Sequence, residues 1–110
     1  MSSNEVVDLR LEATNAAYDN HPVARMNDHV VRISVMTEPY FWHLHPDSDE
    51  TFLVLEGALE IEYRDRIVRL DVAQLTTVLK GVEHRTRPIG DRSVNLTFEH
   101  AAASTVRVGP

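Results

Sequence analysis

The sequence contains no cysteine, which removes disulfide bonds, thiolate metal ligands and a cysteine nucleophile from consideration. It also lacks a long hydrophobic run, since its longest apolar stretches, such as 52–55, are only a few residues long. The first twelve residues carry acidic side chains and no apolar segment typical of a signal peptide. We therefore predict a soluble protein of the cytoplasm, without a membrane partner, in which only nitrogen and oxygen atoms would bind a metal ion.

Clusters of Lys and Arg are missing too, and the net charge is −6 with histidine counted as neutral. Such a charge repels phosphate backbones, so nucleic acid is not expected as a partner. The composition, 43% hydrophobic and 25% charged residues in 110, is that of one globular domain with a packed core. We predict a single domain over residues 1–110, with a barrel core at about 30–99, an N-terminal arm at 1–29 and a C-terminal tail at 100–110.

Helix signals are scarce, and the one candidate runs from Leu11 to Tyr18. Short β-branched and aromatic runs, separated by Pro, Gly, Asp and Asn, instead predict an all-β antiparallel sandwich or barrel. These runs are 30–36, 40–45, 51–55, 59–63, 67–70, 75–79 and 94–98.

Polarity alternates within the run at 94–98. Val94, Leu96 and Phe98 are apolar, whereas Asn95 and Thr97 between them are polar. Because successive side chains of a strand point to opposite faces, this run has one dry face and one wet face.

Four side chains form a candidate metal site. His43 and His45 are two apart in a predicted strand, which places both imidazoles on one face with Cα atoms roughly 7 Å apart. The turn sequence 46–49 then delivers Glu50 to the neighbouring strand. His84 follows a turn at Gly81 and adds a fourth ligand from a distant part of the chain.

The order His-x-His, turn, Glu, apolar strand, Gly, hairpin, strand, Gly-x-x-His resembles the cupin superfamily over about residues 30–99. The first cupin motif reads G(X)5HXH(X)3,4E(X)6G and the second reads G(X)5PXG(X)2H(X)3N. The residues that stand at their places are His43, His45, Glu50 and Gly57 in the first, and Gly81 and His84 in the second.

This resemblance implies a double-stranded β-helix, or jelly-roll barrel, that holds one divalent transition metal. The segments 42–45, 49–50, 55–57 and 80–85 look like those of small bacterial single-domain cupins of the mannose-6-phosphate-isomerase-like group. The motifs are incomplete, because Thr37, Ala73, Leu79 and Pro88 stand where they have Gly, Gly, Pro and Asn. These are turn and backbone positions, so the departures concern loop geometry rather than the ligands.

The identity of the carboxylate ligand is open between two neighbours. The first motif allows three or four residues before its glutamate, so Asp49 fits the shorter spacing and Glu50 the longer. We favour Glu50, since an aspartate in a turn more often accepts a hydrogen bond from the backbone.

Strand parity predicts what surrounds the site. If Glu50 points inward, then Phe52 and Val54 point inward with it, and Phe41 shares the parity of the two strand histidines. These three residues are expected to line a substantially apolar pocket in which we can place no Lys or Arg. Such a pocket disfavours sugar phosphates.

The same parity turns four apolar side chains outward: Trp42, Leu44, Leu53 and Leu55. The resulting patch on the outer wall must be covered, either by the N-terminal arm or by a second copy of the chain. We favour a homodimer.

Several other polar residues have a structural and a functional interpretation. Arg85 and Arg87 could grip an anionic substrate, and Glu83 could orient a metal ligand, but a solvated surface is the more common role of such residues. The remaining histidines are expected to lie outside the metal site: His21, His29 and His100.

Three imidazoles and a carboxylate suit iron, manganese, nickel, cobalt, copper or zinc, and on an octahedral ion they leave two positions for water or substrate. We therefore expect a metal-dependent enzyme that acts on a small oxygen-bearing molecule, of dioxygenase, isomerase or decarboxylase type. The alternative is a non-catalytic module that binds a small ligand or senses a metal. The substrate follows from neither interpretation.

Overall fold

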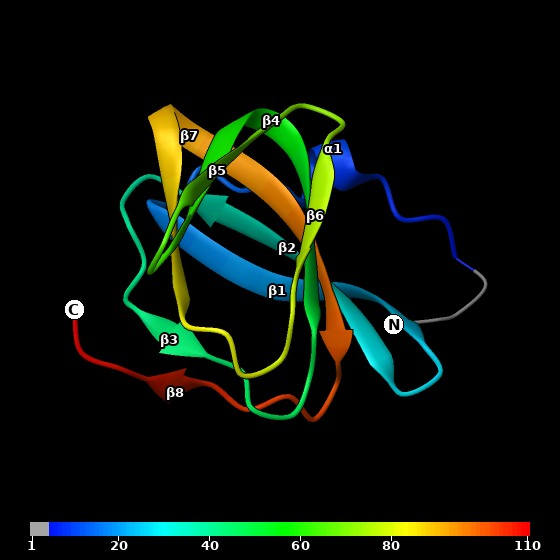
Figure 1. The fold of residues 1–110 in the computed structure, drawn as a ribbon. Helices are drawn as coiled ribbons and strands as arrows, with labels where there is room; N and C mark the ends of the chain where they lie inside the picture. The colour runs from blue at the N-terminus through cyan, green and yellow to red at the C-terminus, as the bar shows by residue number, and fades with distance from the viewer. Residues whose placement is uncertain (1–4) are drawn as a thin grey trace.

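A computed structural model describes residues 5–110, which form a short helix and a curled antiparallel sheet (Figure 1). The helix α1 spans Leu9–Glu12. The strands are β1 (Tyr18–Met26), β2 (His29–Met36), β3 (His43–Leu44), β4 (Glu50–Tyr63), β5 (Ile67–Asp71), β6 (Leu75–Val78), β7 (His84–His100) and β8 (Val106–Arg107). The all-β barrel predicted from the sequence is confirmed.

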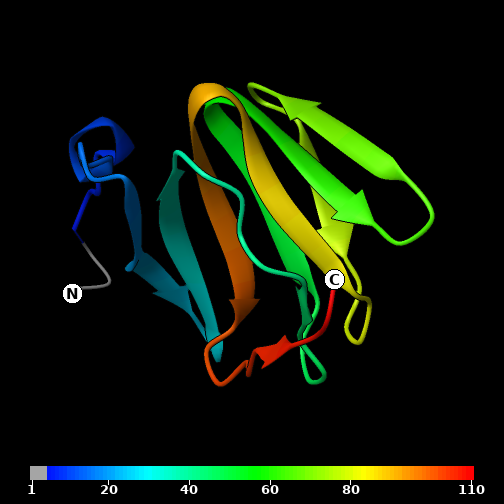
Figure 2. The same cartoon turned by 90° about the vertical axis from the view of Figure 1, so that its left-hand side faces the viewer.

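Two long strands organise the sheet. The order of pairing is β1-β2-β7-β3-β8, and β4 pairs with β5, β6 and β7. Figure 2 shows β4 and β7 in the middle, with β1 and β2 on one side and β5 and β6 on the other. Because β7 pairs with β2, β3 and β4 along its length, it connects both sides of the barrel.

The predicted helix from Leu11 to Tyr18 is wrong. Helix α1 ends at Glu12, and Tyr18 is already the first residue of β1. Tertiary contacts override the weak local helix preference of this segment: Ala13 packs against a hydrophobic cluster, the carbonyl of Ala17 accepts a hydrogen bond from the amide of Thr37, and Tyr18 pairs with β2. Of the predicted N-terminal arm, residues 1–4 lie outside the described residues, and the rest contributes α1 and an edge strand of the sheet.

Two predicted strands, 51–55 and 59–63, are one continuous strand, β4. Gly57, which separates them in the sequence, has a φ of 73° and lies where the β4–β7 register shifts. An irregularity of this kind bends a strand without ending it. The predicted strand 40–45 is in turn shorter than expected, since only His43 and Leu44 are paired as β3.

The residues of β4 and β7 contribute to two hydrophobic clusters. Inside the curled sheet lies a cluster of Met36, Phe52, Val54, Leu59, Ile61, Tyr63, Leu70 and Val78. A second cluster, on the opposite face of β1, β2 and β7, consists of Val23, Ile33, Val35, Val94 and Leu96. Burial of both clusters provides the main driving force for the fold.

The chain itself covers much of the predicted outer apolar patch. Leu53 and Leu55 pack against the second cluster together with Leu9 and Ala13 from the N-terminal segment. Trp42 lies elsewhere and is only 9% exposed. The guanidinium of Arg64 stands 3.9 Å from the centroid of its ring. These side chains therefore do not form one open surface.

The predicted tail at 100–110 is part of the sheet. Strand β8 pairs with β3, and the amide of Val108 donates to the carbonyl of Trp42. Within residues 5–110, no helix has the length and hydrophobicity that a membrane crossing requires.

Gly57 supplies a test of this description. A Cβ atom at this position would collide with the carbonyl oxygen of Arg92, and the positive φ disfavours any other residue. Gly90 also has a positive φ, 83°, but a Cβ atom there meets open space. We expect Gly57→Ala to lower the free energy of unfolding by roughly 2–4 kcal/mol and Gly90→Ala by about 1 kcal/mol, as measured by urea denaturation. Equal losses would contradict the close approach of the two strands at Gly57.

Candidate metal centre

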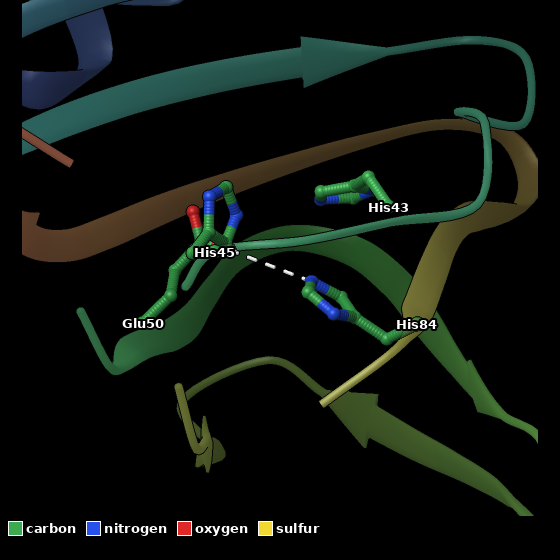
Figure 3. Close-up of side chains that lie close together, drawn as sticks. All are labelled: His43, His45, Glu50 and His84. Carbon is green, nitrogen blue, oxygen red and sulfur yellow. Dashed lines mark ion pairs between the residues drawn. The ribbon is translucent and has the colours of Figure 1, made fainter. Parts of the chain in front are cut away.

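Four side chains from separate segments converge at one end of the barrel (Figure 3). His43 lies in β3 and His45 just after it, while Glu50 and His84 are the first residues of β4 and β7. The Cα atoms of His43 and His84 are register partners, which holds β3 against the start of β7. Each residue offers one ligand atom, and these four atoms lie within 4.8 Å of one another.

The cluster is buried and polar. Its members are only 0–8% exposed, and His84 is fully buried. Oε1 of Glu50 is 3.2 Å from Nε2 of His45 and 3.7 Å from Nε2 of His84. None of these three atoms has a well-directed hydrogen-bond partner. Buried polar atoms without such partners are costly, so the centre of the cluster fits an additional group that binds all of them.

Main-chain carbonyl groups orient the three imidazoles. Nδ1 of His43 lies 2.8 Å from the carbonyl oxygen of Phe41, and Nδ1 of His84 lies 2.9 Å from that of Val82. Nδ1 of His45 lies 3.0 Å from the carbonyl oxygen of Ser104. Because a carbonyl only accepts, each Nδ1 carries the proton. In the neutral ring Nε2 then presents a lone pair to the centre, as a metal ligand requires.

The electrostatics of the cluster also suit a cation. Burial raises the pKa of Glu50, but the close imidazoles of His45 and His84 outweigh it and lower the value to about 2. The adjacent carboxylate of Glu50 raises the pKa of His45 to about 9, whereas burial lowers that of His43 to about 4. Without a metal, His45 and Glu50 thus form an ion pair. An ion bound here would displace the proton of His45.

The donor set fits a divalent transition metal. Three imidazole nitrogens and one carboxylate oxygen are borderline ligands, which transition-metal ions bind well. Mg²⁺ and Ca²⁺ instead prefer sites made of oxygen ligands. All four residues named from the sequence are therefore brought together. The other histidines lie elsewhere: His21 contacts Asp19 and Glu12, while His29 and His100 contact Asp28.

Asp49 does not point into the cluster. Its side chain is exposed, and its Oδ1 accepts a hydrogen bond from the amide of Lys80 at 2.8 Å. This contact ties the turn before β4 to the turn before β7. Asp49 thus has the backbone-binding role that was the alternative to a metal ligand.

A cavity of about 260 Å³ opens from the metal cluster into the barrel. The prediction of a substantially apolar pocket is wrong, since most residues that line this cavity are polar. Besides His43, His45 and Glu50 they include Asn20, Arg32, Ser34, Thr86, Asn95, Thr97, Glu99 and Thr105, so that an arginine lies where none was expected. The reason is that the polar faces of β2 and β7 point into the barrel, whereas their apolar faces form the second hydrophobic cluster.

The three predicted pocket residues have different places. Phe52 lines the cavity. Val54 is fully buried in the inner hydrophobic cluster and is not part of the lining. Phe41 precedes β3 and borders a different hollow beside Trp42, where Arg107 stands 4.8 Å from its ring centroid.

Sequence reasoning missed the contribution of the C-terminal segment. Ser104 supplies the carbonyl that orients His45, and Thr105 lines the cavity. A carbonyl group leaves no signal in the sequence. The polar side of the run 94–98, by contrast, was visible there, although not the direction in which it faces.

The charged residues near His84 lie outside the cavity. Arg85 contacts Glu62 at 2.8 Å, and Arg87 forms an ion pair with Glu60 across the β4–β7 pair. Glu83 contacts Arg64 rather than any imidazole. They have the surface roles that we favoured.

Comparisons with known proteins agree with this geometry. Residues 31–98 match the model of a family described as Cupin domain. The uncharacterized protein YdbB of Bacillus subtilis (strain 168) is 47% identical over 88 residues, which are 79% of this chain and 77% of that protein.

Solved structures share the barrel. A cupin-2 domain containing protein from Shewanella frigidimarina NCIMB 400 superposes with a TM-score of 0.80 at 28% identity, over 86% of this chain and 94% of that one. The DMSP lyase DddQ from Ruegeria pomeroyi DSS-3 has a TM-score of 0.72 at 16% identity, over 84% of this chain and 52% of that one. The second likeness concerns the fold alone.

The placement of the two adjacent carboxylates predicts different effects of removing each charge. We expect Glu50→Gln to weaken binding of Co²⁺ or Zn²⁺ at least about 100-fold, since losing even a residue that only supports a metal ligand costs about 10- to 100-fold. Asp49→Asn keeps an acceptor for the amide of Lys80 and should change the affinity less than about threefold. Competition with a chromophoric chelator measures both. A larger loss in Asp49→Asn would reverse the assignment.

Proposed function

Because this chain belongs to the cupin domain family, we propose that it is a metal-dependent enzyme acting on a small oxygen-bearing molecule. The proposed cofactor is one divalent transition metal, among iron, manganese, nickel, cobalt, copper and zinc. Its proposed ligands are His43, His45, Glu50 and His84. The observation that supports this most directly is the convergence of the four side chains on one point. A main-chain carbonyl group holds the Nδ1 atom of each imidazole, so that its Nε2 atom is free to bind the ion.

A bound ion of this kind would act as a Lewis acid toward an oxygen atom of the substrate. The chain contributes the rest of the site: the carbonyl groups fix the imidazoles, and the adjoining cavity admits a small molecule beside the cluster. The reaction is proposed to be of dioxygenase, isomerase or decarboxylase type. That the barrel of the DMSP lyase DddQ is similar supports catalysis in a fold of this shape, without indicating which reaction occurs here.

The subgroup of cupins to which the chain belongs is also a proposal. The segments around the four ligands support a place in the mannose-6-phosphate-isomerase-like group of small cupins. This is a relationship of sequence and does not specify an isomerase activity.

Elemental analysis of protein purified without a His-tag, followed by assays with each candidate metal, tests the function. We expect about one transition-metal ion per chain. Turnover of at least one compound among diketones, phenolic acids and sugar phosphates should follow. His84→Ala should abolish both metal content and turnover, because it removes a fully buried ligand. His29→Ala, which changes an exposed histidine, is the matched control and should preserve both.

The outcomes separate the candidate functions. Protein that contains no metal and takes up none on titration would contradict the metal site itself. Stoichiometric metal without turnover, together with a metabolite that raises the melting temperature, would replace the enzyme with a small-ligand or metal-sensing module.

We further propose that the protein is located in the cytoplasm and that two copies of the chain form a homodimer. Strand β6 pairs only with β4 among the described strands, which leaves its other edge open. Leu75 and Leu79 beside this edge are 62% and 61% exposed. An open strand edge with large apolar side chains favours pairing with a second copy.

Sedimentation equilibrium measures the assembly. We expect a mass twice that of the 12.5 kDa chain, and Leu75→Glu should shift the mass toward one chain. A wild-type protein that sediments as a single chain at micromolar concentration would rule out the dimer.

A further inference from the structure

One wall of the cavity carries buried polar atoms that the metal cluster does not use. Asn95 and Thr97 are 1% and 3% exposed, and the side chain of Glu99 is 14% exposed. Oδ1 of Asn95, Oγ1 of Thr97 and Oε2 of Glu99 have no hydrogen-bond partner. All three residues line the cavity. We call them the β7 wall.

The pairing of the strands places the β7 wall next to the metal cluster. Glu99 is the register partner of Glu50, and Thr97 is the partner of Phe52. Asn95 follows on the same face of β7. Successive members are two residues apart, so they are spaced by roughly 7 Å along the strand. The wall therefore begins beside the proposed ion and extends away from it into the barrel.

The free atoms of the wall determine which ligand groups it can bind. Oε2 of Glu99 is an acceptor, and so is Oδ1 of Asn95, whose amide nitrogen donates to Ser93. The Thr97 hydroxyl both donates and accepts. Such atoms require donors from a ligand, which disfavours a carboxylate or phosphate group here. Oxygen atoms without protons belong at the metal end instead.

Arg32 distinguishes between the remaining donors. It lines the same cavity, with its Nε 4.0 Å from Oε1 of Glu99 and its Nη1 3.3 Å from Oδ1 of Asn20. Because this guanidinium already offsets much of the charge of Glu99, a positively charged ammonium group would gain little attraction at the wall. Neutral hydroxyl groups satisfy the acceptors of the wall without adding a charge.

We propose that the β7 wall, formed by Asn95, Thr97 and Glu99, recognises the hydroxyl groups of a small polyhydroxylated acid. The acid end of this ligand faces the metal cluster and the hydroxylated chain lies along β7. The inference rests on the proposed function, because the ion fixes the orientation of the ligand.

Calorimetric titration of Co²⁺-loaded protein with two six-carbon acids tests the wall. Gluconate and 2-hydroxyhexanoate offer the same 2-hydroxycarboxylate to the ion, but only gluconate carries hydroxyl groups along the rest of its chain. We expect wild-type protein to bind gluconate about tenfold more tightly or better, since one satisfied buried hydrogen bond is worth up to about that factor.

Variants assign this preference to the wall. Thr97→Val keeps the shape of the side chain and removes its hydroxyl, and Asn95→Leu removes the side-chain amide at nearly constant volume. Each should lower the affinity for gluconate several-fold and leave that for 2-hydroxyhexanoate unchanged. Thr51→Val makes the same chemical change outside the cavity, where Thr51 bonds to Thr77, and should change neither affinity.

The failures are distinguishable. If Co²⁺ binds and the two acids bind equally, if neither acid binds, or if both wall variants retain the preference for gluconate, the hydroxyl site is overturned while the metal site stands. If Co²⁺ does not bind, the proposed function fails, and the orientation proposed for the ligand fails with it.

Discussion

The site depends on three hydrogen bonds between imidazole rings and main-chain carbonyl groups. Two of them are local, because His43 and His84 each contact the carbonyl of the residue two positions earlier. The third joins His45 to Ser104, 59 positions later in the chain. A ring that is held at Nδ1 can direct only Nε2 toward the centre. The pairing of β8 with β3 is therefore a condition for the site, since it brings the C-terminal segment to His45.

This arrangement places a cost on the folded chain that the hydrophobic clusters must offset. Each buried polar atom without a partner costs about 1–3 kcal/mol, and several of them meet around Glu50. The ion pair between His45 and Glu50 lowers that cost without a metal, and a bound ion would lower it further. The two clusters on either face of the sheet supply the compensating burial. Organisation of the site before a metal arrives thus depends on the barrel as a whole.

The ligand residues could be predicted because strand parity and turn chemistry act over short distances. His43 and His45 share a face by the period of a strand, and the order of the motifs indicated that Glu50 and His84 would join them. The strand boundaries were less predictable. Gly57 signals a turn in the sequence, yet pairing of β4 with β7 on both sides of it makes it a bulge. The contact of Ser104 uses the backbone, which carries no residue-specific signal.

The prediction of a wet face in 94–98 was wrong, because its polar side chains are buried inside the barrel. Alternation in 94–98 correctly separates a polar from an apolar side, and either side could have faced the solvent. Here neither does: Leu96 is buried under the N-terminal segment, and Asn95 is buried in the barrel. A polar interior has no value for packing, because apolar side chains would fill the same space at lower cost. A polar interior next to four convergent metal-binding side chains is therefore best explained by a ligand that contacts both the polar wall and the metal cluster.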